Sequence, residues 1–427
     1  MAIPIQGQNR GELRRLIGPA LGIMTSLAAT TTVDTSSLID TLNLRGADDE
    51  HNGKELVAFD PAGSIVAGEK SRVSDFDGDT YDATCAPVFS ATITTGDDFE
   101  LWNTPWLSSD INKAIDEAIL RATSKCLQNK VTETTFTKPS TYLYDCLSGF
   151  KGVEKVEHEY GIGTEVIIDD CDTVWTAGTS VTASLDTTLT IEGSSSVKLV
   201  VAAGAAAGAV LGYGTISSSD LTKCDKIEIS MYSTIALTAG YLDLVLDDHA
   251  GCVSPTESLD IPAMAANTWY RHIITLANPV SDTAIISVGL VNTTDVGACT
   301  LYIDYIRAVD SRSRNYKELN DEYWDIAHDS TPLLQLTTEA LSVIGTPKLL
   351  KITGYQLPAL LSDDTTDVEI DPDYIVNMAK GLLMSGHSKA RTLDVENREK
   401  KGNDYITLAL NRLNQIGTQM NSNIRWV

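Results

Sequence analysis

Residues 165–310 carry a hydrophobic pattern that differs from the chain on either side. Short runs rich in Val, Ile, Leu, Thr and Tyr alternate apolar with polar positions, and Gly, Ser, Asp and Asn separate the runs. Such alternation indicates antiparallel strands, and roughly eight to ten runs are enough for two packed sheets. No helix is indicated here. The pattern predicts a complete antiparallel β-sandwich at 162–310, inserted into another domain.

The chain before the insert opens with a predicted short amphipathic helix at 9–17. Its apolar side consists of Leu13, Leu16 and Ile17. Alternating segments from 25 to 102, with a hairpin signal at Asp77-Gly78, predict a small β-barrel or sandwich of roughly five or six strands. An apolar stripe at helical spacing predicts the next helix, at 108–128, and extended chain follows to residue 160.

After the insert, strands are predicted from Tyr316 onward, followed by two helices. Asp371 and Pro372 are suited to the cap and first position of one helix, which Gly386 ends, and the other covers 395–416. The strand arriving at His158 should pair with the strands that follow the insert, and the three longer helices should pack as a small bundle.

The predicted fold class is α+β and multidomain. A small helical bundle with a β-barrel and sheet framework, formed by 1–161 and 311–427, carries the inserted sandwich at 162–310.

Charge argues against a nucleic-acid-binding protein. The chain has 32 basic and 58 acidic residues, a formal net charge of −26, and no basic stripe that could release counterions from phosphates. Arg10, Arg14 and Arg15 form one basic helix face, which is either solvated or directed at a protein partner. An acidic wall would repel DNA, which suits a conduit through which DNA passes.

Seven dispersed cysteines without a C-x-x-C pair predict reduced, mostly buried thiols and no zinc site. The first 25 residues lack the apolar core of a signal peptide, and no run is long enough to span a bilayer. We therefore expect synthesis in a cytoplasm and no membrane partner.

Signatures of catalysis are missing from the sequence. It contains no G-x-S-x-G, no phosphate-binding glycine loop of the common types and no H-E-x-x-H, and its six histidines are dispersed. We expect the protein not to be an enzyme.

The insert contains an acidic opening with a tryptophan ("IDDCDTVW"), then "GSSSVKL", "NTW" at a strand start and "LYIDYI" near its end. In this order and spacing it resembles the jelly-roll carbohydrate-binding modules. The resemblance implies adjacent first and last strands, and a structural calcium ion as the one candidate cofactor. Matching oxygen ligands would be Asp169 or Asp170, Glu192 and Asp304. The alternative is that Asp304 caps a strand end by hydrogen bonding.

Sugar binding would require exposed aromatic rings that stack on the apolar faces of pyranoses. The candidates of first choice are Tyr213, Tyr232 and Tyr241, and the further ones are Trp269, Tyr270 and Tyr302. The family usually buries residues at the positions of Trp175 and Trp269, so these two are expected in the core.

The flanks resemble the neck (head–tail adaptor) proteins of tailed bacteriophages. The matching segments are "TTTVDTSSLI", "HNGKELVAF", "VSDFDGDTYDATCAPVFS", "INKAIDEAIL", "VEKVEHE" and "LLKITGYQLPALLSDDTTDVEIDPDYIVNMAKGLLM". The resemblance implies a virion protein that forms a homo-oligomeric ring, usually of about twelve copies. Its partners would be the portal protein and the tail, nozzle or next neck protein, with genomic DNA passing through unbound.

The C-terminal pair Arg425 and Trp426 is suited to anchoring on a partner, with Trp426 folding back onto its own helix as the alternative. Two functions follow. The first is a head-to-tail adaptor with an outward-projecting jelly roll that decorates the neck or contacts tail fibres. The second is a tail or fibre-base protein whose jelly roll binds host-surface carbohydrate.

Overall fold

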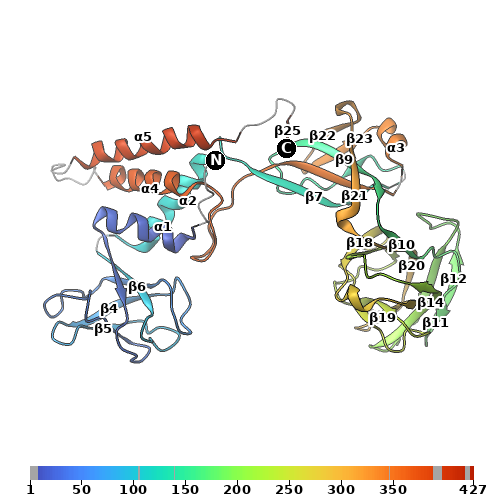
Figure 1. Ribbon diagram of the computed structural model, residues 1–427, viewed down its shortest axis with the longest axis horizontal. Coiled ribbons are helices and arrows are strands. Elements are labelled where there is room, and N and C mark those ends of the chain that lie inside the picture. Colours follow the sequence, from blue (N-terminus) through green and yellow to red (C-terminus); the bar gives the residue numbers. More distant parts are fainter. Residues whose placement is uncertain (1–7, 104–105, 139, 346, 388–396, 419–423) are drawn as a thin grey trace. The chain divides into compact units, whose positions relative to one another are not determined.

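The computed structural model describes residues 8–103, 106–138, 140–345, 347–387, 397–418 and 424–427. The fold is mostly β-sheet, in several separate sheets. The chain divides into two compact units (Figure 1). The first comprises 1–129 and 355–421, and the second comprises 130–354 and 422–427. No helix among the described residues is both long and apolar enough to cross a membrane.

The β part of the first unit is a six-stranded sheet in the order β1-β6-β3-β4-β5-β2. Its strands are β1 (Met24–Ala28), β2 (Ser37–Ile39), β3 (Glu55–Ala58), β4 (Lys70–Asp77), β5 (Asp82–Cys85) and β6 (Asp98–Trp102). The turn after Asp77 joins β4 to β5, which pair antiparallel, so the predicted hairpin is confirmed. Phe76, Phe89 and Phe99 lie in its own apolar core.

The helices of the first unit share a second core. They are α1 (Arg10–Ile17), the 3₁₀ turn η1 (Pro19–Leu21), α2 (Ser108–Ala122), α4 (Pro372–His387) and α5 (Arg398–Ile416). The predicted stripe of α2 is buried against α4, and the Tyr374 hydroxyl of α4 donates to the Ala118 carbonyl at 2.9 Å. Asp371 caps α4 by accepting from the Tyr374 amide at 3.1 Å, as predicted.

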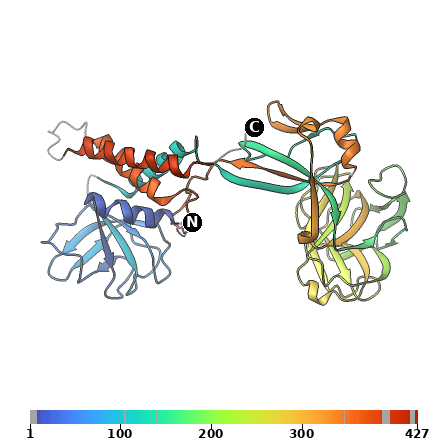
Figure 2. The ribbon, with the colours of Figure 1, turned by 45° about the horizontal axis from the view of Figure 1, so that its top comes forward.

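Two glycines let α4 and α5 approach closely, and the two helices run side by side in Figures 1 and 2. A Cβ at Gly381 would lie 2.5 Å from the Ile406 side chain and 2.9 Å from the Gly402 carbonyl. A Cβ at Gly402 would lie 3.1 Å from the Gly381 carbonyl. The close crossing of α4 and α5 therefore requires residues without a side chain at positions 381 and 402.

The second unit contains the predicted sandwich. The first sandwich sheet has the order β12-β13-β20-β15-β18, with β10 also on β20, and the second sandwich sheet has the order β11-β14-β19-β16-β17. The strands are β10 (Glu165–Asp169), β11 (Thr176–Ala177), β12 (Val181–Asp186), β13 (Ser196–Val201), β14 (Ala209–Ser219), β15 (Lys226–Ser233), β16 (Leu242–Asp247), β17 (Glu257–Asp260), β18 (Trp269–Thr275), β19 (Ile285–Asn292) and β20 (Cys299–Val309).

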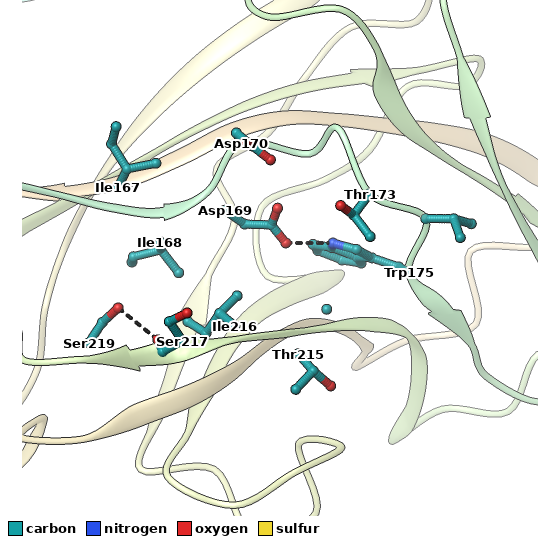
Figure 3. Close-up of a pocket in the computed structure, with 12 residues that line it drawn as sticks. Ile167, Ile168, Asp169, Asp170, Thr173, Trp175, Thr215, Ile216, Ser217 and Ser219 are labelled. Atoms are coloured by element: carbon teal, nitrogen blue, oxygen red, sulfur yellow. Dashed lines mark hydrogen bonds between the residues drawn. The ribbon is translucent and has the colours of Figure 1, made fainter.

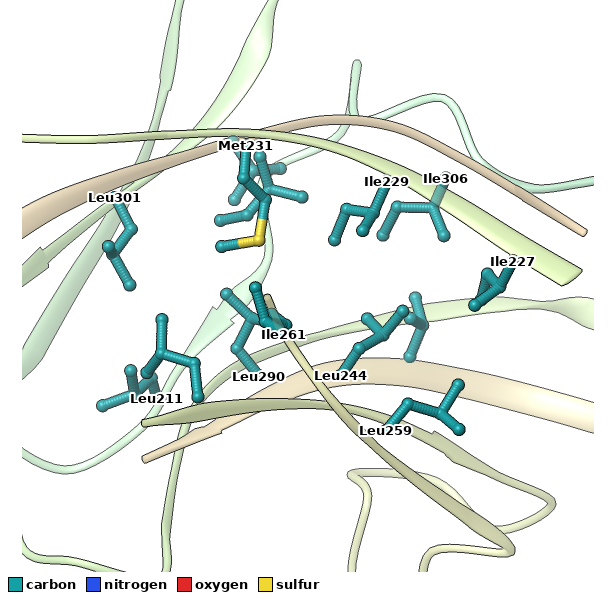
Figure 4. Close-up of a cluster of buried hydrophobic side chains, with 14 of the residues drawn as sticks. Leu211, Ile227, Ile229, Met231, Leu244, Leu259, Ile261, Leu290, Leu301 and Ile306 are labelled. Carbon is teal, nitrogen blue, oxygen red and sulfur yellow. The ribbon is translucent and has the colours of Figure 1, made fainter. Parts of the chain in front are cut away.

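Leucine, isoleucine and methionine side chains from both sandwich sheets interdigitate in one core (Figure 4). Residues 165–310 are all described and hold no α-helix, only the 3₁₀ turn η2 (Pro279–Ser281), as the alternation predicted. The first and last strands, β10 and β20, pair antiparallel, as the resemblance implied.

The rest of the second unit consists of two sheets and a short helix. The long sheet has the order β21-β9-β24-β7, with β25 also on β9, and the small sheet has the order β22-β23-β8. The elements are β7 (Gln128–Phe136), β8 (Leu143–Tyr144), β9 (Gly152–Ile162), the 3₁₀ turn η3 (Ser311–Ser313), β21 (Arg314–Glu318), the 3₁₀ turn η4 (Asp321–Tyr323), β22 (Trp324–His328), β23 (Pro332–Leu336), α3 (Thr338–Ile344), β24 (Leu349–Gln356) and β25 (Arg425–Trp426).

The strand before the insert pairs with the strand after it. His158 lies opposite Lys317 and Ile162 opposite Arg314, so the predicted pairing of β9 with β21 is confirmed. The helix α3 was not predicted, since it is too short for a clear apolar period.

Buried ion pairs hold the sandwich to the long sheet. Arg307 of β20 contacts Glu228 at 2.7 Å and Glu159 at 3.3 Å, and Arg314 contacts the same two carboxylates. All four side chains are at most 7% exposed. Glu228 and Arg307 belong to the sandwich, whereas Glu159 and Arg314 belong to β9 and β21, so this charge network joins the insert to its support.

Candidate functional site

The outer face of the first sandwich sheet carries a continuous row of side chains. Pairing across the sheet places Ser184 opposite Lys198, Lys198 opposite Tyr302, Tyr302 opposite Tyr232, and Tyr232 opposite Trp269. Directly paired residues point to the same face of a sheet. In β15 the alternate residues Ile227, Ile229 and Met231 fill the core, so this row faces outward. We call these five residues the aromatic row.

The central ring of the aromatic row, Tyr232, contacts the two other rings. The Tyr232 ring centroid lies 5.8 Å from Trp269 at an interplanar angle of 54°, and 5.5 Å from Tyr302 at 85°. Tyr232 and Trp269 are half-buried, and Tyr302 is 7% exposed. Such tilted contacts hold the rings rigidly, and the two half-buried rings, Tyr232 and Trp269, keep part of their surface accessible.

Polar groups border these rings. The Lys198 ammonium lies 5.5 Å from the Tyr302 ring centroid and 3.6 Å from an Asp186 carboxylate oxygen. A hydrogen bond with Tyr302 is the largest effect that raises the pKa of Lys198, so the ammonium stays protonated at neutral pH. The Tyr232 hydroxyl donates to the Asn267 side-chain oxygen at 3.2 Å. Donors and acceptors thus stand beside an aromatic surface, an arrangement that recognises ligands with both apolar faces and hydroxyl groups.

Of the three tyrosines predicted first for sugar binding, only Tyr232 belongs to the aromatic row. Tyr213 lies on β14 in the second sandwich sheet, and Tyr241 lies in the turn before β16. The prediction that Trp269 is a core residue is wrong. In β18 the side chains of Tyr270 and Ile274 turn inward, which places Trp269 on the other face.

Trp175 is buried in the sandwich core, as predicted. Sequence reasoning named Tyr302 as a candidate but missed Lys198. The alternation of "SVKLVV" carries the signal, because Val197 and Leu199 are inward and Lys198 must then be outward.

The predicted calcium ligands do not meet as one group. Asp169 accepts hydrogen bonds from Trp175 Nε1 and the Cys171 amide, both at 2.8 Å, and Glu192 pairs with Arg271 at 2.8 Å. The exposed Asp170 accepts from the Asp172 amide at 3.2 Å.

Asp304 acts as a hydrogen-bonding cap, which was the predicted alternative to calcium binding. One of its carboxylate oxygens accepts from the Ile191 amide at 2.6 Å and the Glu192 amide at 3.0 Å. Within the described parts of the chain, the single cluster of three metal-ligand-type side chains lies elsewhere, at Asp247, Asp248 and His249. Asp247 is buried there, and the two other side chains are exposed.

A cavity of about 330 Å³ lies between β10 and β14 (Figure 3). Asp169 and Trp175 point into it, joined by their hydrogen bond. Burial raises the pKa of Asp169, against the opposing effect of the bonds from Cys171 and Trp175. Both oxygens of Asp169 already have donors, so the cavity offers mainly hydroxyl groups and the half-exposed side chain of Ile167.

The predicted partner-facing role of the first helix is wrong for Arg14. Its side chain is fully buried and pairs with Glu100 at 2.9 Å and with Asp364 at 2.5 Å. Arg10 also pairs with Asp364, and Arg15 pairs with Asp98. These arginines stabilise the interior and edge of the first unit.

The C-terminal pair forms a strand rather than folding back onto a helix. Arg425 and Trp426 make up β25 and pair with Val153 and Gly152 of β9. The Arg425 guanidinium lies 4.3 Å from the Trp324 ring centroid, and Trp426 is 49% exposed. The exposed indole remains a candidate contact surface.

No protein-family model matches the sequence, and no curated protein matches it. Similar solved structures include the family 11 carbohydrate-binding module of the cellulosomal cellulase Lic26A-Cel5E of Clostridium thermocellum, at 11% identity and a TM-score of 0.28. The match covers 35% of this chain and 96% of that one. The CBM22-1 xylan-binding domain from Paenibacillus barcinonensis Xyn10C is similar at 16% identity and a TM-score of 0.23, over 38% of this chain and 98% of that one.

The fold therefore defines a mostly β protein of several sheets, whose largest part is a two-sheet sandwich. At such identities and TM-scores, ligand and function must be argued from the residues of this chain.

Proposed function

We propose that the protein is a non-catalytic tail or fibre-base component of a bacteriophage whose sandwich binds host-surface carbohydrate through the aromatic row. The observation that carries the proposal is the row itself, in which the Tyr232 ring contacts the rings of Trp269 and Tyr302 on the outer face of the first sandwich sheet. Ring faces stack on the apolar faces of pyranoses, and contacting rings lose little conformational entropy on binding.

The dimensions of the row favour an oligosaccharide. Lys198, Tyr302, Tyr232 and Trp269 lie on four adjacent strands, which at about 4.8 Å spacing give a length of roughly 14 Å. Ser184 and Asn267 offer hydroxyl and amide groups close to the rings, and Lys198 supplies a cation. The ligand class is a short neutral or acidic glycan.

The test is a glycan array with the full chain, followed by calorimetric titration of the best ligand. Trp269→Ala and Tyr232→Ala should each weaken binding at least tenfold, about 1.4 kcal/mol, because each removes part of the stacking surface. Tyr213→Ala and Trp426→Ala are matched controls, since both remove an aromatic ring outside the row. An array without hits, or binding equally weakened by the controls, would contradict the proposal.

A second candidate function is the head-to-tail adaptor, a virion ring that joins the portal protein to the next neck or tail protein. Support comes from the first unit, in which segments from both ends of the sequence share one helical core. Leu408 and Leu410 of α5 are 55% and 47% exposed, which suits helix packing against another subunit. Imaging of the purified chain should then show a hollow ring of about twelve subunits, and a monomer would exclude this candidate.

A further inference from the structure

The cavity between β10 and β14 shares no lining residue with the aromatic row (Figure 3). It lies where both sandwich sheets have a free strand edge. β10 pairs with β20 along one edge, and the described sheets place no strand on its other edge. In β14 the pairing with β19 stops at Thr215 and resumes at Ser219, and β11 reaches only Gly212 and Tyr213. A space of about 330 Å³ therefore remains open between the sheets.

Most of the polar groups around the cavity are hydroxyls. Thr173 lies in the crossover from β10 to β11, and Thr215, Ser217 and Ser219 lie on β14. The Ser219 hydroxyl donates to the Ser217 carbonyl at 3.1 Å, whereas the side chains of Thr215 and Ser217 are exposed. A hydroxyl both donates and accepts hydrogen bonds, and it rotates to suit its partner. These groups therefore match a ligand that also carries hydroxyls.

Asp169 adds a fixed acceptor to this lining. Its carboxylate points into the cavity and is held by the Trp175 indole N–H and the Cys171 amide, both at 2.8 Å. An ionised carboxylate has about four lone-pair positions, so acceptor capacity remains for a ligand. Gly214 makes the arrangement possible, because a Cβ there would lie 2.6 Å from Asp169 Oδ2 and 2.7 Å from Trp175 Nε1.

The charge of the lining favours a neutral ligand. The lining has two acidic side chains, Asp169 and Asp170, and no basic one. A phosphate or carboxylate would be repelled by them and by the net charge of −26. Two N–H donors already compensate the charge of Asp169, and burial raises its pKa against their opposing effect. Asp170 is exposed, so solvent screens its attraction for an ammonium group.

Apolar side chains and a small volume restrict the ligand further. Ile167 and Val174 line the cavity and are 54% and 50% exposed. Contact with C–H groups of a ligand would remove this apolar surface from water. A volume of about 330 Å³ is at the lower end of the range for small-molecule sites, which suits a single ring rather than a longer chain.

We propose that this cavity binds a neutral, polyhydroxylated ligand of single-ring size, with a hexose as the best match. Ligand hydroxyls donate to Asp169 and exchange hydrogen bonds with Thr215 and Ser217, while C–H groups contact Ile167. The site differs from the aromatic row in every residue, so it does not depend on the function proposed above. The small contact area gives an affinity on the order of millimolar.

The experiment measures binding of glucose, galactose and mannose to the full chain by saturation-transfer NMR and calorimetry. At least one of these sugars should bind in the millimolar range. Its uronic acid and its amino-sugar counterpart keep the ring and add a negative or a positive charge. The uronic acid should bind at least about tenfold more weakly, and the amino sugar should bind no more tightly.

Thr215→Val removes one hydroxyl at nearly constant volume and should weaken binding about three- to tenfold, the equivalent of one hydrogen bond. Ser217→Ala should act in the same direction. Thr182→Val is the matched control, because Thr182 is an exposed strand residue of the same sandwich outside the cavity. Trp269→Ala should retain the sugar, and Thr215→Val should retain oligosaccharide binding by the aromatic row, so the two sites can fail separately.

Three results would overturn the proposal. The first is a panel without binding, or binding weakened equally by Thr182→Val and Thr215→Val. The second is tighter binding of the amino sugar, which would show a site for cations. The third is loss of the sugar in Trp269→Ala with retention in Thr215→Val, which would assign the sugar to the aromatic row.

Discussion

Arg14 and Asp364 form a bidentate ion pair inside the first unit, although 350 residues separate them in the sequence. Arg14 Nη1 lies 2.6 Å from Asp364 Oδ1, and Arg14 Nη2 lies 2.5 Å from Asp364 Oδ2. The Arg14 side chain has no exposure and that of Asp364 has 7%. Segments from the two ends of the sequence therefore fold together, and most of the second unit lies between them in the sequence.

Removal of one partner should destabilise the first unit strongly. Asp364→Ala leaves Arg14 buried with only Glu100 as a charged partner, and breaking such a pair costs about 3–5 kcal/mol. Urea unfolding followed by circular dichroism measures the change. Asp98→Ala is the control, because its pair with Arg15 is 22% and 34% exposed and should contribute at most about 1 kcal/mol. Equal losses in both variants would contradict the assignment.

The same pair predicts an acid response. Burial alone would raise the pKa of Asp364, but the hydrogen bonds and charges of Arg14 and Arg10 outweigh it and lower the pKa below the usual value. The stabilisation is therefore present above about pH 4 and lost as the pH falls through the folded-state pKa. The difference in unfolding free energy between the wild-type protein and Asp364→Ala should shrink over that acid range.

The charge network of Arg307, Arg314, Glu159 and Glu228 predicts a second stability effect. Glu228→Gln leaves two arginines sharing one buried carboxylate, so about 3 kcal/mol of stability should be lost. Glu165→Gln is the control, since Glu165 also contacts Arg307, at 2.7 Å, but is 31% exposed. Limited proteolysis at 310–313 should become faster in Glu228→Gln alone, and similar rates in both variants would argue against the network.

The glycine contact between α4 and α5 predicts opposite results for two similar substitutions. Gly381→Ala improves helix propensity by about 1 kcal/mol but forces a methyl group into Ile406 and the Gly402 carbonyl, so the net effect should be a loss of about 1–3 kcal/mol. Gly386→Ala lies on the same helix with nothing within 4 Å and should be neutral or stabilising. Thermal unfolding of both variants measures this, and equal behaviour would show that the helices do not cross as described.

Burial lowers the pKa of His272 to about 4, and its Nε2 has no hydrogen-bond partner among the described residues. Between pH 6.5 and about 4 the unfolded chain binds a proton at this position and the folded chain does not, so stability falls with decreasing pH. The loss of unfolding free energy should reach up to about 3 kcal/mol.

His272→Phe keeps an aromatic ring at the position that stacks on Tyr270 at 5.7 Å, and it should flatten this part of the profile of stability against pH. His249→Phe is the control, since that side chain is exposed and the pKa of His249 is raised by its bond to Asp248. An unchanged slope in His272→Phe would contradict the assignment.

Local periodicity predicted the elements well, because strand alternation and helical spacing depend on neighbouring residues. The α2 stripe and the hairpin at Asp77 followed from such spacing. The inward side of α1 could not be predicted from such spacing. Leu16 was expected there, but it is 44% exposed, while Arg14 is buried by Glu100 and Asp364, which are distant in sequence.

The candidate site was predicted only in part. A strand has two faces, and the hydrophobicity of an aromatic residue does not show which face it occupies. Trp269 lies on the outer face of the first sandwich sheet because Tyr270 and Ile274 in the same strand point into the core. Lys198 was missed, because its outward position follows only from the inward positions of Val197 and Leu199 in the same strand.

The opposed positions of Ile162 and Arg314 have an evolutionary consequence. The chain enters and leaves the sandwich at adjacent positions of one β-ladder. Recombination can therefore exchange or delete the segment between Ile162 and Arg314, because a tight turn is enough to join the two strands. Such an exchange would remove Arg307 and Glu228, and Glu159 and Arg314 would keep only each other as charged partners in this network. Lineages that carry a different module at this point should therefore have changed these two positions together.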